Sequence, residues 1–126
     1  MFPVESGFER DLLNLILQVR WSVRQVDTDL AIEVVKPLFD LTTRLGPCRP
    51  DFVLEVTKPG KDKKALIVEA MGFDTPEYEA AKAITLPRMQ LIGPIFPIRP
   101  EHIRPANLIE TSKSLTKWVQ EQAAAL

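Results

Sequence analysis

Apolar residues recur every three or four positions between residues 8 and 23, and this spacing predicts a first helix from about residue 7 to 25. The apolar face of that helix consists of Phe8, Leu12, Leu15, Ile16, Val19 and Val23. Ser6 and Glu9 have the spacing of a capping box, with Ser6 as the N-cap and Glu9 as the third helical residue. The pattern therefore indicates an amphipathic helix that covers one side of a core.

The next apolar run covers residues 32–39 and has the composition of a strand. Pro37 within it favours a position at the edge of a sheet, because proline cannot donate a backbone hydrogen bond. We expect residues 41–50 to connect this strand to the strands that follow.

Two further apolar runs, over residues 51–56 and 65–71, predict a pair of strands. The charged segment between them contains Pro59 and Gly60, which is typical of a turn. The two runs therefore form a predicted antiparallel hairpin centred near Gly60, and its second strand ends at Gly72.

The remaining third of the chain predicts a helix, a short strand and a closing helix. Thr75 is a candidate N-cap with Pro76 in the first helical position, Pro87 should kink or interrupt the helix, and Gly93 ends it. Residues 95–98 form the last predicted strand and residues 106–125 the closing helix. The side chains of the closing helix that we expect to face the core are Ile109, Leu115, Trp118 and Val119.

This order of elements, αβββαβ with a closing helix, predicts an α/β fold with a mixed four-stranded sheet flanked by helices. The second helix would cross over between the third and fourth strands, which requires those two strands to be parallel. A chain of 126 residues suits one domain over residues 1–126.

Composition adds limits to this picture. No apolar run approaches the length of about 20 residues that a membrane-spanning helix needs, so we expect no membrane partner. Cys48 is the only cysteine, which rules out an intrachain disulfide and fits a cytoplasmic protein. The net charge of −1 counts against a nucleic-acid partner, although an active site built from carboxylates would itself shift the balance toward acid.

The candidate chemistry lies in the hairpin. Glu69 is a carboxylate inside an otherwise apolar run, where it needs compensation. In a hairpin centred near Gly60, Asp51 lies directly opposite Glu69, with about 5 Å between their Cβ atoms. Two like charges repel at that distance, whereas a divalent cation between them removes the repulsion. The pattern therefore indicates a metal site, and the alternative is a strand-end acid beside a salt-bridged one.

These residues resemble the PD-(D/E)xK nuclease-like superfamily, which has the restriction-endonuclease-like fold. Pro50 and Asp51 look like its "PD", and Glu69 begins its "(D/E)xK". The lysine position holds Met71, so the resemblance implies a variant in which Lys82 on the following helix replaces that lysine. The stretch from residue 49 to 82 is also similar to nuclease-like domains of bacterial mobile-element proteins.

The resemblance implies a Mg²⁺- or Mn²⁺-dependent phosphodiesterase acting on DNA. Asp51, Glu69 and the Ala70 carbonyl would hold the metal, and Lys82 would be catalytic. Glu9 could complete the metal site, although its capping role already explains it. Tyr78 shares a helix face with Lys82 and is a further candidate site residue, with packing as the alternative.

Other features of the sequence keep rival interpretations open. Four lysines surround the hairpin turn and either face solvent or follow a phosphate backbone; they are Lys58, Lys61, Lys63 and Lys64. Met71 and the near-neutral charge favour an alternative, a catalytically inactive nuclease-fold module for nucleic-acid binding or protein assembly. Either form would act as a homodimer or as part of a larger DNA-processing protein.

Overall fold

The computed structural model describes residues 7–72 and 74–126, so the predicted Ser6 cap lies outside the described residues. The elements are α1 (Gly7–Val26), β1 (Ala31–Val35), β2 (Leu41–Thr43), β3 (Gly46–Cys48), β4 (Phe52–Thr57), β5 (Lys64–Ala70), α2 (Pro76–Gln90), β6 (Ile95–Ile98), the 3₁₀ helix η1 (Pro100–Ile103) and α3 (Leu108–Ala124). None of the described helices is long and apolar enough to span a bilayer.

Four strands form the main sheet in the order β1-β4-β5-β6. The first three form an antiparallel meander, and β6 pairs with β5 in parallel. Helix α2 connects the parallel pair, because a crossover is needed to bring the chain back in the same direction. The predicted α/β fold with a mixed four-stranded sheet, and the predicted parallel pair within it, are confirmed.

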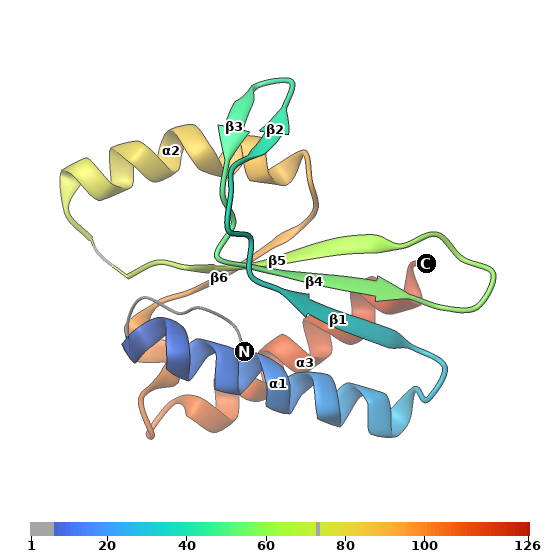
Figure 1. Ribbon diagram of the computed structural model, residues 1–126. Coiled ribbons are helices and arrows are strands. Elements are labelled where there is room, and N and C mark those ends of the chain that lie inside the picture. Colours follow the sequence, from blue (N-terminus) through green and yellow to red (C-terminus); the bar gives the residue numbers. More distant parts are fainter. Residues whose placement is uncertain (1–6, 73) are drawn as a thin grey trace.

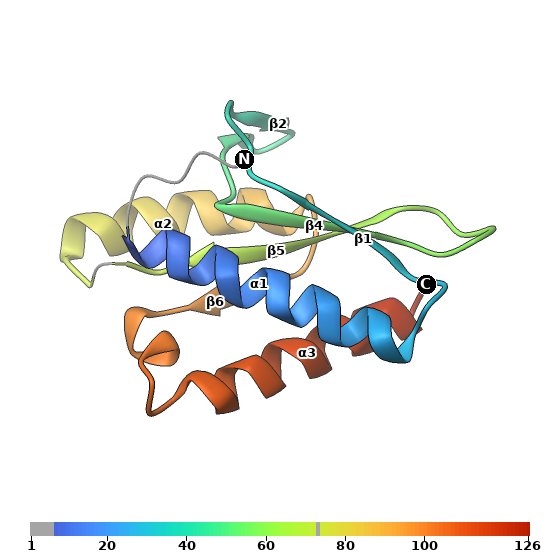
Figure 2. The same cartoon turned by 60° about the horizontal axis from the view of Figure 1, so that its bottom comes forward.

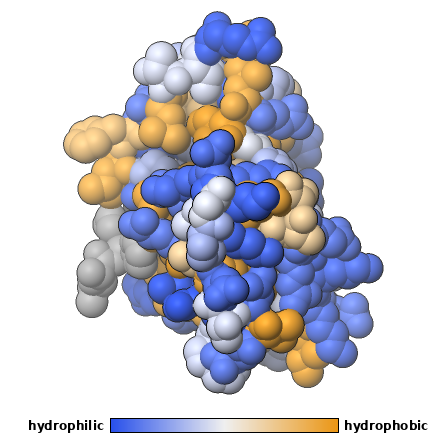
Figure 3. All heavy atoms as spheres, turned by 90° about the vertical axis from the view of Figure 1, so that its right-hand side faces the viewer, coloured by the Kyte–Doolittle hydropathy of each residue, from blue (hydrophilic) through white to orange (hydrophobic). Residues whose placement is uncertain are grey.

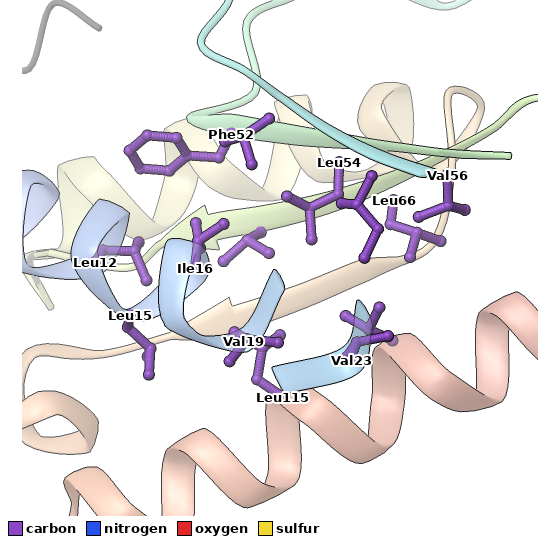
Figure 4. Close-up of a cluster of buried hydrophobic side chains, with 14 of the residues drawn as sticks. Leu12, Leu15, Ile16, Val19, Val23, Phe52, Leu54, Val56, Leu66 and Leu115 are labelled. Carbon is purple, nitrogen blue, oxygen red and sulfur yellow. The ribbon is translucent and has the colours of Figure 1, made fainter. Parts of the chain in front are cut away.

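The sheet separates two groups of helices. Figure 1 shows α2 on one side and α1 and α3 on the other, and Figure 2 shows α1 and α3 running beside each other beneath the strands. The larger core fills the space between the sheet and these two helices, where the apolar face predicted for α1 meets β4 and β5 (Figure 4). Its most buried members include Leu12, Ile16, Val19, Val23, Phe52, Leu54, Val56, Leu66, Val68 and Leu115.

A smaller core lies between the sheet and α2, and it contains Cys48, Val53, Ile67 and Met89. Successive side chains of a strand point to opposite faces, so Val53 and Ile67 face α2 while their neighbours face α1 and α3. The same alternation brings Glu69 to the α2 face. The candidate acid thus belongs to the layer between α2 and the sheet.

Two predictions between β1 and β4 need correction. The first strand ends at Val35 rather than continuing to residue 39, because the chain leaves the sheet before Pro37. It does occupy the edge of the sheet, as expected. Residues 41–50 are also more than a connection, since β2 and β3 form a small antiparallel hairpin there. Strands of three residues, one of them containing Pro47, show no alternating pattern that would reveal them in the sequence.

Two predictions on the helices also need correction, the interruption of α2 at Pro87 and the burial of Ile109. Helix α2 runs through Pro87 to Gln90 without interruption, and the buried side chain of Met89 anchors its last turn against the sheet. A proline inside a helix removes one hydrogen bond, which such packing can offset. Ile109 is 72% exposed, because the buried face of α3 runs through residues spaced four apart, from Thr111 to Leu115 and Val119.

Candidate active site

Asp51 and Glu69 lie next to each other at the end of the β4–β5 ladder. Phe52 is opposite Val68, so the two acids are the next residues along the strands, and the hairpin is centred at Gly60 as predicted. The Asp51 backbone N–H donates to Glu69 Oε1 at 2.8 Å. The Ala70 N–H in turn donates to Asp51 Oδ2, also at 2.8 Å. The backbone N–H of Asp51 therefore orients the Glu69 carboxylate, and the one directly after Glu69 orients the Asp51 carboxylate.

Lys82 reaches this pair from α2. Its Nζ donates to Glu69 Oε2 and lies 4.0 Å from Asp51 Oδ2. The Glu69 side chain is 1% exposed, and those of Lys82 and Asp51 are 14% and 20% exposed. The structure thus brings Asp51, Glu69 and Lys82, which are distant in sequence, into one largely buried cluster.

The charges of this cluster are not balanced. When both acids are ionised, Asp51 and Glu69 carry two negative charges against the one positive charge of Lys82. Burial, together with the negative charge of Asp51, raises the pKa of Glu69 from 4.5 to about 7, although Lys82 acts in the opposite direction. Burial alone would lower the pKa of Lys82, but the charges of Glu69 and Asp51 outweigh it and raise that pKa. A further cation near the two carboxylates would be favoured by this excess of negative charge.

Tyr78 holds the strand end beside the cluster. Its hydroxyl donates to the Ala70 carbonyl at 2.9 Å and accepts from the Gly72 N–H at 3.3 Å. The Thr75 hydroxyl caps α2 by accepting from the Tyr78 N–H at 3.3 Å, as predicted for this residue. One helical turn later, Lys82 Nζ lies 5.4 Å from the centre of the Tyr78 ring. The first turns of α2 therefore bring both Tyr78 and Lys82 to the end of β5.

A small cavity of about 140 Å³ opens beside Asp51. Glu9 and Lys36 line it together with Asp51, and the Lys36 ammonium is 3.2 Å from Glu9 Oε2. The first helix thus brings Glu9 to the same cavity as Asp51, where Lys36 partly neutralises it. Sequence reasoning missed Lys36, since no local pattern shows that the end of β1 meets the start of α1.

The hairpin lysines lie elsewhere. They surround the β4–β5 turn, at the end of the strands opposite to Asp51 and Glu69. Lys58 is 3.1 Å from Asp27, Lys63 is 2.9 Å from Glu55, and Lys64 Nζ donates to Gln122 Oε1 at 2.9 Å. The structure does not bring these lysines to the carboxylate cluster, and their role in nucleic-acid binding stays a prediction.

The donor atoms of the cluster fit a hard divalent cation. The two carboxylates lie side by side, and the Ala70 carbonyl at the same strand end is a third oxygen donor. Mg²⁺ needs only one or two protein carboxylates when phosphate and water supply its remaining ligands. No cluster of three or more His, Cys, Asp or Glu side chains suited to a metal occurs within residues 7–72 and 74–126. The described residues therefore offer fewer ligands to a cation bound by protein atoms alone than to one that a phosphate also coordinates.

Comparison with known proteins identifies relatives of the chain. The family model described as restriction endonuclease-like C-terminal domain matches residues 5–123. An uncharacterized protein in the cib 5′ region of Escherichia coli is 31% identical over 97 residues, which make up 72% of this chain and 44% of that protein. The chain thus spans less than half the length of this relative. No solved structure matches it significantly.

Proposed function

This chain belongs to the restriction endonuclease-like C-terminal domain family, and from that membership we propose that it is a divalent-metal-dependent nuclease that hydrolyses phosphodiester bonds of DNA. Family membership accounts for the nuclease-type fold. The roles given below to individual residues are part of our proposal. In this proposal residues 1–126 form one domain that carries the whole activity. The domain would act either as a homodimer or as part of a longer protein.

The observation that supports this proposal most strongly is the pairing of Asp51 with Glu69. Both carboxylates accept hydrogen bonds from backbone N–H groups, and both lie in a largely buried layer beside the single ammonium of Lys82. A protein selected for stability alone would replace such a pair by apolar residues at little or no cost. Two buried acids with excess negative charge are the arrangement expected where a cation must bind.

Each residue then has a definite task. Asp51, Glu69 and the Ala70 carbonyl would hold Mg²⁺ or Mn²⁺, which would polarise the scissile phosphate and lower the pKa of an attacking water. Lys82, which contacts Glu69, would take the part of the lysine that the superfamily carries at the position of Met71, and its ammonium would stabilise negative charge that develops on the phosphate. Tyr78 is a positioning residue, because its hydroxyl holds the Ala70 carbonyl.

A cleavage assay tests the proposal. The native chain should cut DNA in Mg²⁺ or Mn²⁺ but not in EDTA, and Asp51→Asn and Lys82→Gln should each lower the rate at least a hundredfold, a typical cost of losing an electrostatic catalytic group. Glu55→Gln is the matched control, since Glu55 is another acid of the hairpin but pairs with Lys63 away from the cluster. Equal rates for Asp51→Asn and Glu55→Gln would reject the assigned site.

One observation favours the alternative, an inactive nuclease-fold module for binding or assembly. Lys82 already contacts Glu69 and lies near Asp51, so the cluster is partly neutralised without any metal. In that case the native chain would bind DNA in EDTA and cut none in any divalent metal. Binding would then be unchanged in Asp51→Asn.

A further inference from the structure

Residues 36–50, which include β2 and β3, project from the main sheet beside the candidate site; we call this segment the arm. Figure 1 shows the arm rising beyond the plane of the four strands, next to α2. Arg88 of α2 contacts the arm beside the turn of the β2–β3 hairpin, where its Nη1 donates to the Pro47 carbonyl at 2.9 Å. The guanidinium fills the space where a Cβ on Gly46 would lie, 2.7 Å from Arg88 Cζ. The arm is therefore held in a defined place and not merely a long loop.

The arm exposes large apolar side chains. Phe39 is 79% exposed, Leu38 is 57% exposed and Leu45 is 51% exposed. Figure 3 shows hydrophobic atoms at the surface in the upper part of the molecule, at the height of the β2–β3 hairpin. A folded protein commonly exposes single apolar residues, but three exposed ones within eight residues of one projecting segment indicate a surface that something covers.

The charge of the arm differs from that of the rest of the chain. It contains three basic residues, Lys36, Arg44 and Arg49, and one acid, Asp40, which gives it a charge of +2 within a chain of net charge −1. Arg49 lies 3.2 Å from Asp40, and Lys36 is paired with Glu9. Apolar side chains beside an excess of basic ones match the surface of nucleic acid, which presents both base faces and phosphates.

The arm is also continuous with the candidate site. Lys36, Leu38 and Arg49 line the 140 Å³ cavity together with Asp51, so a polymer whose phosphate lay at Asp51 would extend along the arm. A protein partner would have no reason to be aligned with the carboxylates in this way.

We propose that the arm is a DNA-binding element, on which Phe39 and Leu38 contact an exposed base next to the phosphate at the site and Arg44 contacts the backbone. This inference rests on the proposed function in one respect, that DNA is the ligand of the site. It adds a binding surface that neither the carboxylate pair nor the hairpin lysines supply.

The test is the affinity of the whole chain for a fluorescently labelled DNA duplex and for one of its single strands, measured by anisotropy in EDTA so that no cleavage occurs. Phe39→Ala should weaken binding roughly tenfold or more, because stacking of one base contributes that much. Phe39→Trp should restore it. Arg44→Ala should weaken binding and lower the slope of log affinity against log salt by about one. Ile109→Ala is the control, since Ile109 is similarly exposed at 72% but lies on α3.

The outcomes separate the two proposals. The proposed DNA-binding role of the arm is overturned if Phe39→Ala leaves the affinity for DNA unchanged, or if the native chain does not bind DNA. Dissociation of a homodimer by Phe39→Ala with no change in DNA affinity also overturns it and makes a second copy the occupant. If the native chain binds DNA through Phe39 but never cuts it in Mg²⁺ or Mn²⁺, the arm stands and only the nuclease assignment fails.

Discussion

The ammonium of Lys82 and the carboxylate of Glu69 form an ion pair between helix α2 and strand β5, with the Glu69 side chain 1% exposed. The pair therefore links α2 to the sheet as well as compensating the charge of the buried acid. Breaking a buried pair by removing one partner is costly, since the other charge stays in the interior.

Replacement of Lys82 by Met should therefore destabilise the protein in EDTA by about 3 kcal/mol, the usual order for an orphaned buried charge. Unfolding in urea measures the loss. Addition of Mg²⁺ should recover more stability in Lys82→Met than in the native chain, because the metal would then be the only cation near both acids.

Lys117→Met is the control for this experiment. Lys117 is 79% exposed and its Nζ lies 4.0 Å from Glu121, so its removal should have little effect on the midpoint. A similar midpoint for both variants would mean that the Lys82 ion pair contributes nothing to folding.

The pH dependence of stability follows from Glu69. Its pKa rises from 4.5 to about 7 on folding, so between these values the folded chain keeps a proton that the unfolded chain has lost. The stabilising contribution is complete below 4.5 and disappears as the pH rises through about 7. The free energy of unfolding of the native chain in EDTA should therefore fall across this range relative to Glu69→Gln, which cannot titrate. A difference between the two proteins that does not vary with pH would contradict this assignment.

Gly93 provides a test of the connection between α2 and β6. A Cβ at this position would lie 2.0 Å from the Ala65 carbonyl oxygen of β5, and backbone cannot move aside as a flexible side chain can. Gly93→Ala should thus cost about 1 to 3 kcal/mol in urea unfolding, the range for overpacking. Gly7→Ala, where nothing lies within 4 Å, should cost nothing. Equal stability of the two variants would show that this close approach is not present.

Arg88 should control the mobility of the arm more than the stability of the fold. Arg88→Ala removes the hydrogen bond to the Pro47 carbonyl and the packing of the guanidinium against Gly46. The free energy of unfolding should fall by about 1 kcal/mol. Amide exchange in residues 41–48 should become faster, while exchange in β4 and β5 stays slow. Unchanged exchange in the arm would mean that Arg88 does not hold it.

The hairpin was predictable because its signals are local. A Pro-Gly turn and two apolar runs fix the register around Gly60, and that register alone brings Asp51 opposite Glu69. Thr75 and Pro76 likewise mark the start of α2. The contact of Lys82 with Glu69 was not derivable from spacing, since it depends on how α2 lies across the sheet, and only the family resemblance pointed to it.

Contacts between distant segments without a motif escaped the sequence analysis. The approach of Lys36 to Glu9 depends on where β1 ends beside α1. The position of the arm depends on the contact of the Arg88 guanidinium with Gly46. Ile109 was misplaced because the apolar spacing of α3 permits more than one buried face, and packing against the sheet selected the one through Leu115. Tertiary packing decides these features, and a local pattern does not contain it.

The most direct test of the central claim is calorimetric titration of the native chain with Mg²⁺ and Mn²⁺, compared with Asp51→Asn and Glu69→Gln, both alone and with a DNA duplex present. The account predicts that one metal ion binds per chain in the presence of DNA and that each substitution abolishes this binding. Metal binding that survives in both variants, or that is absent from the native chain even with DNA, would contradict the assignment of Asp51 and Glu69 as a metal site.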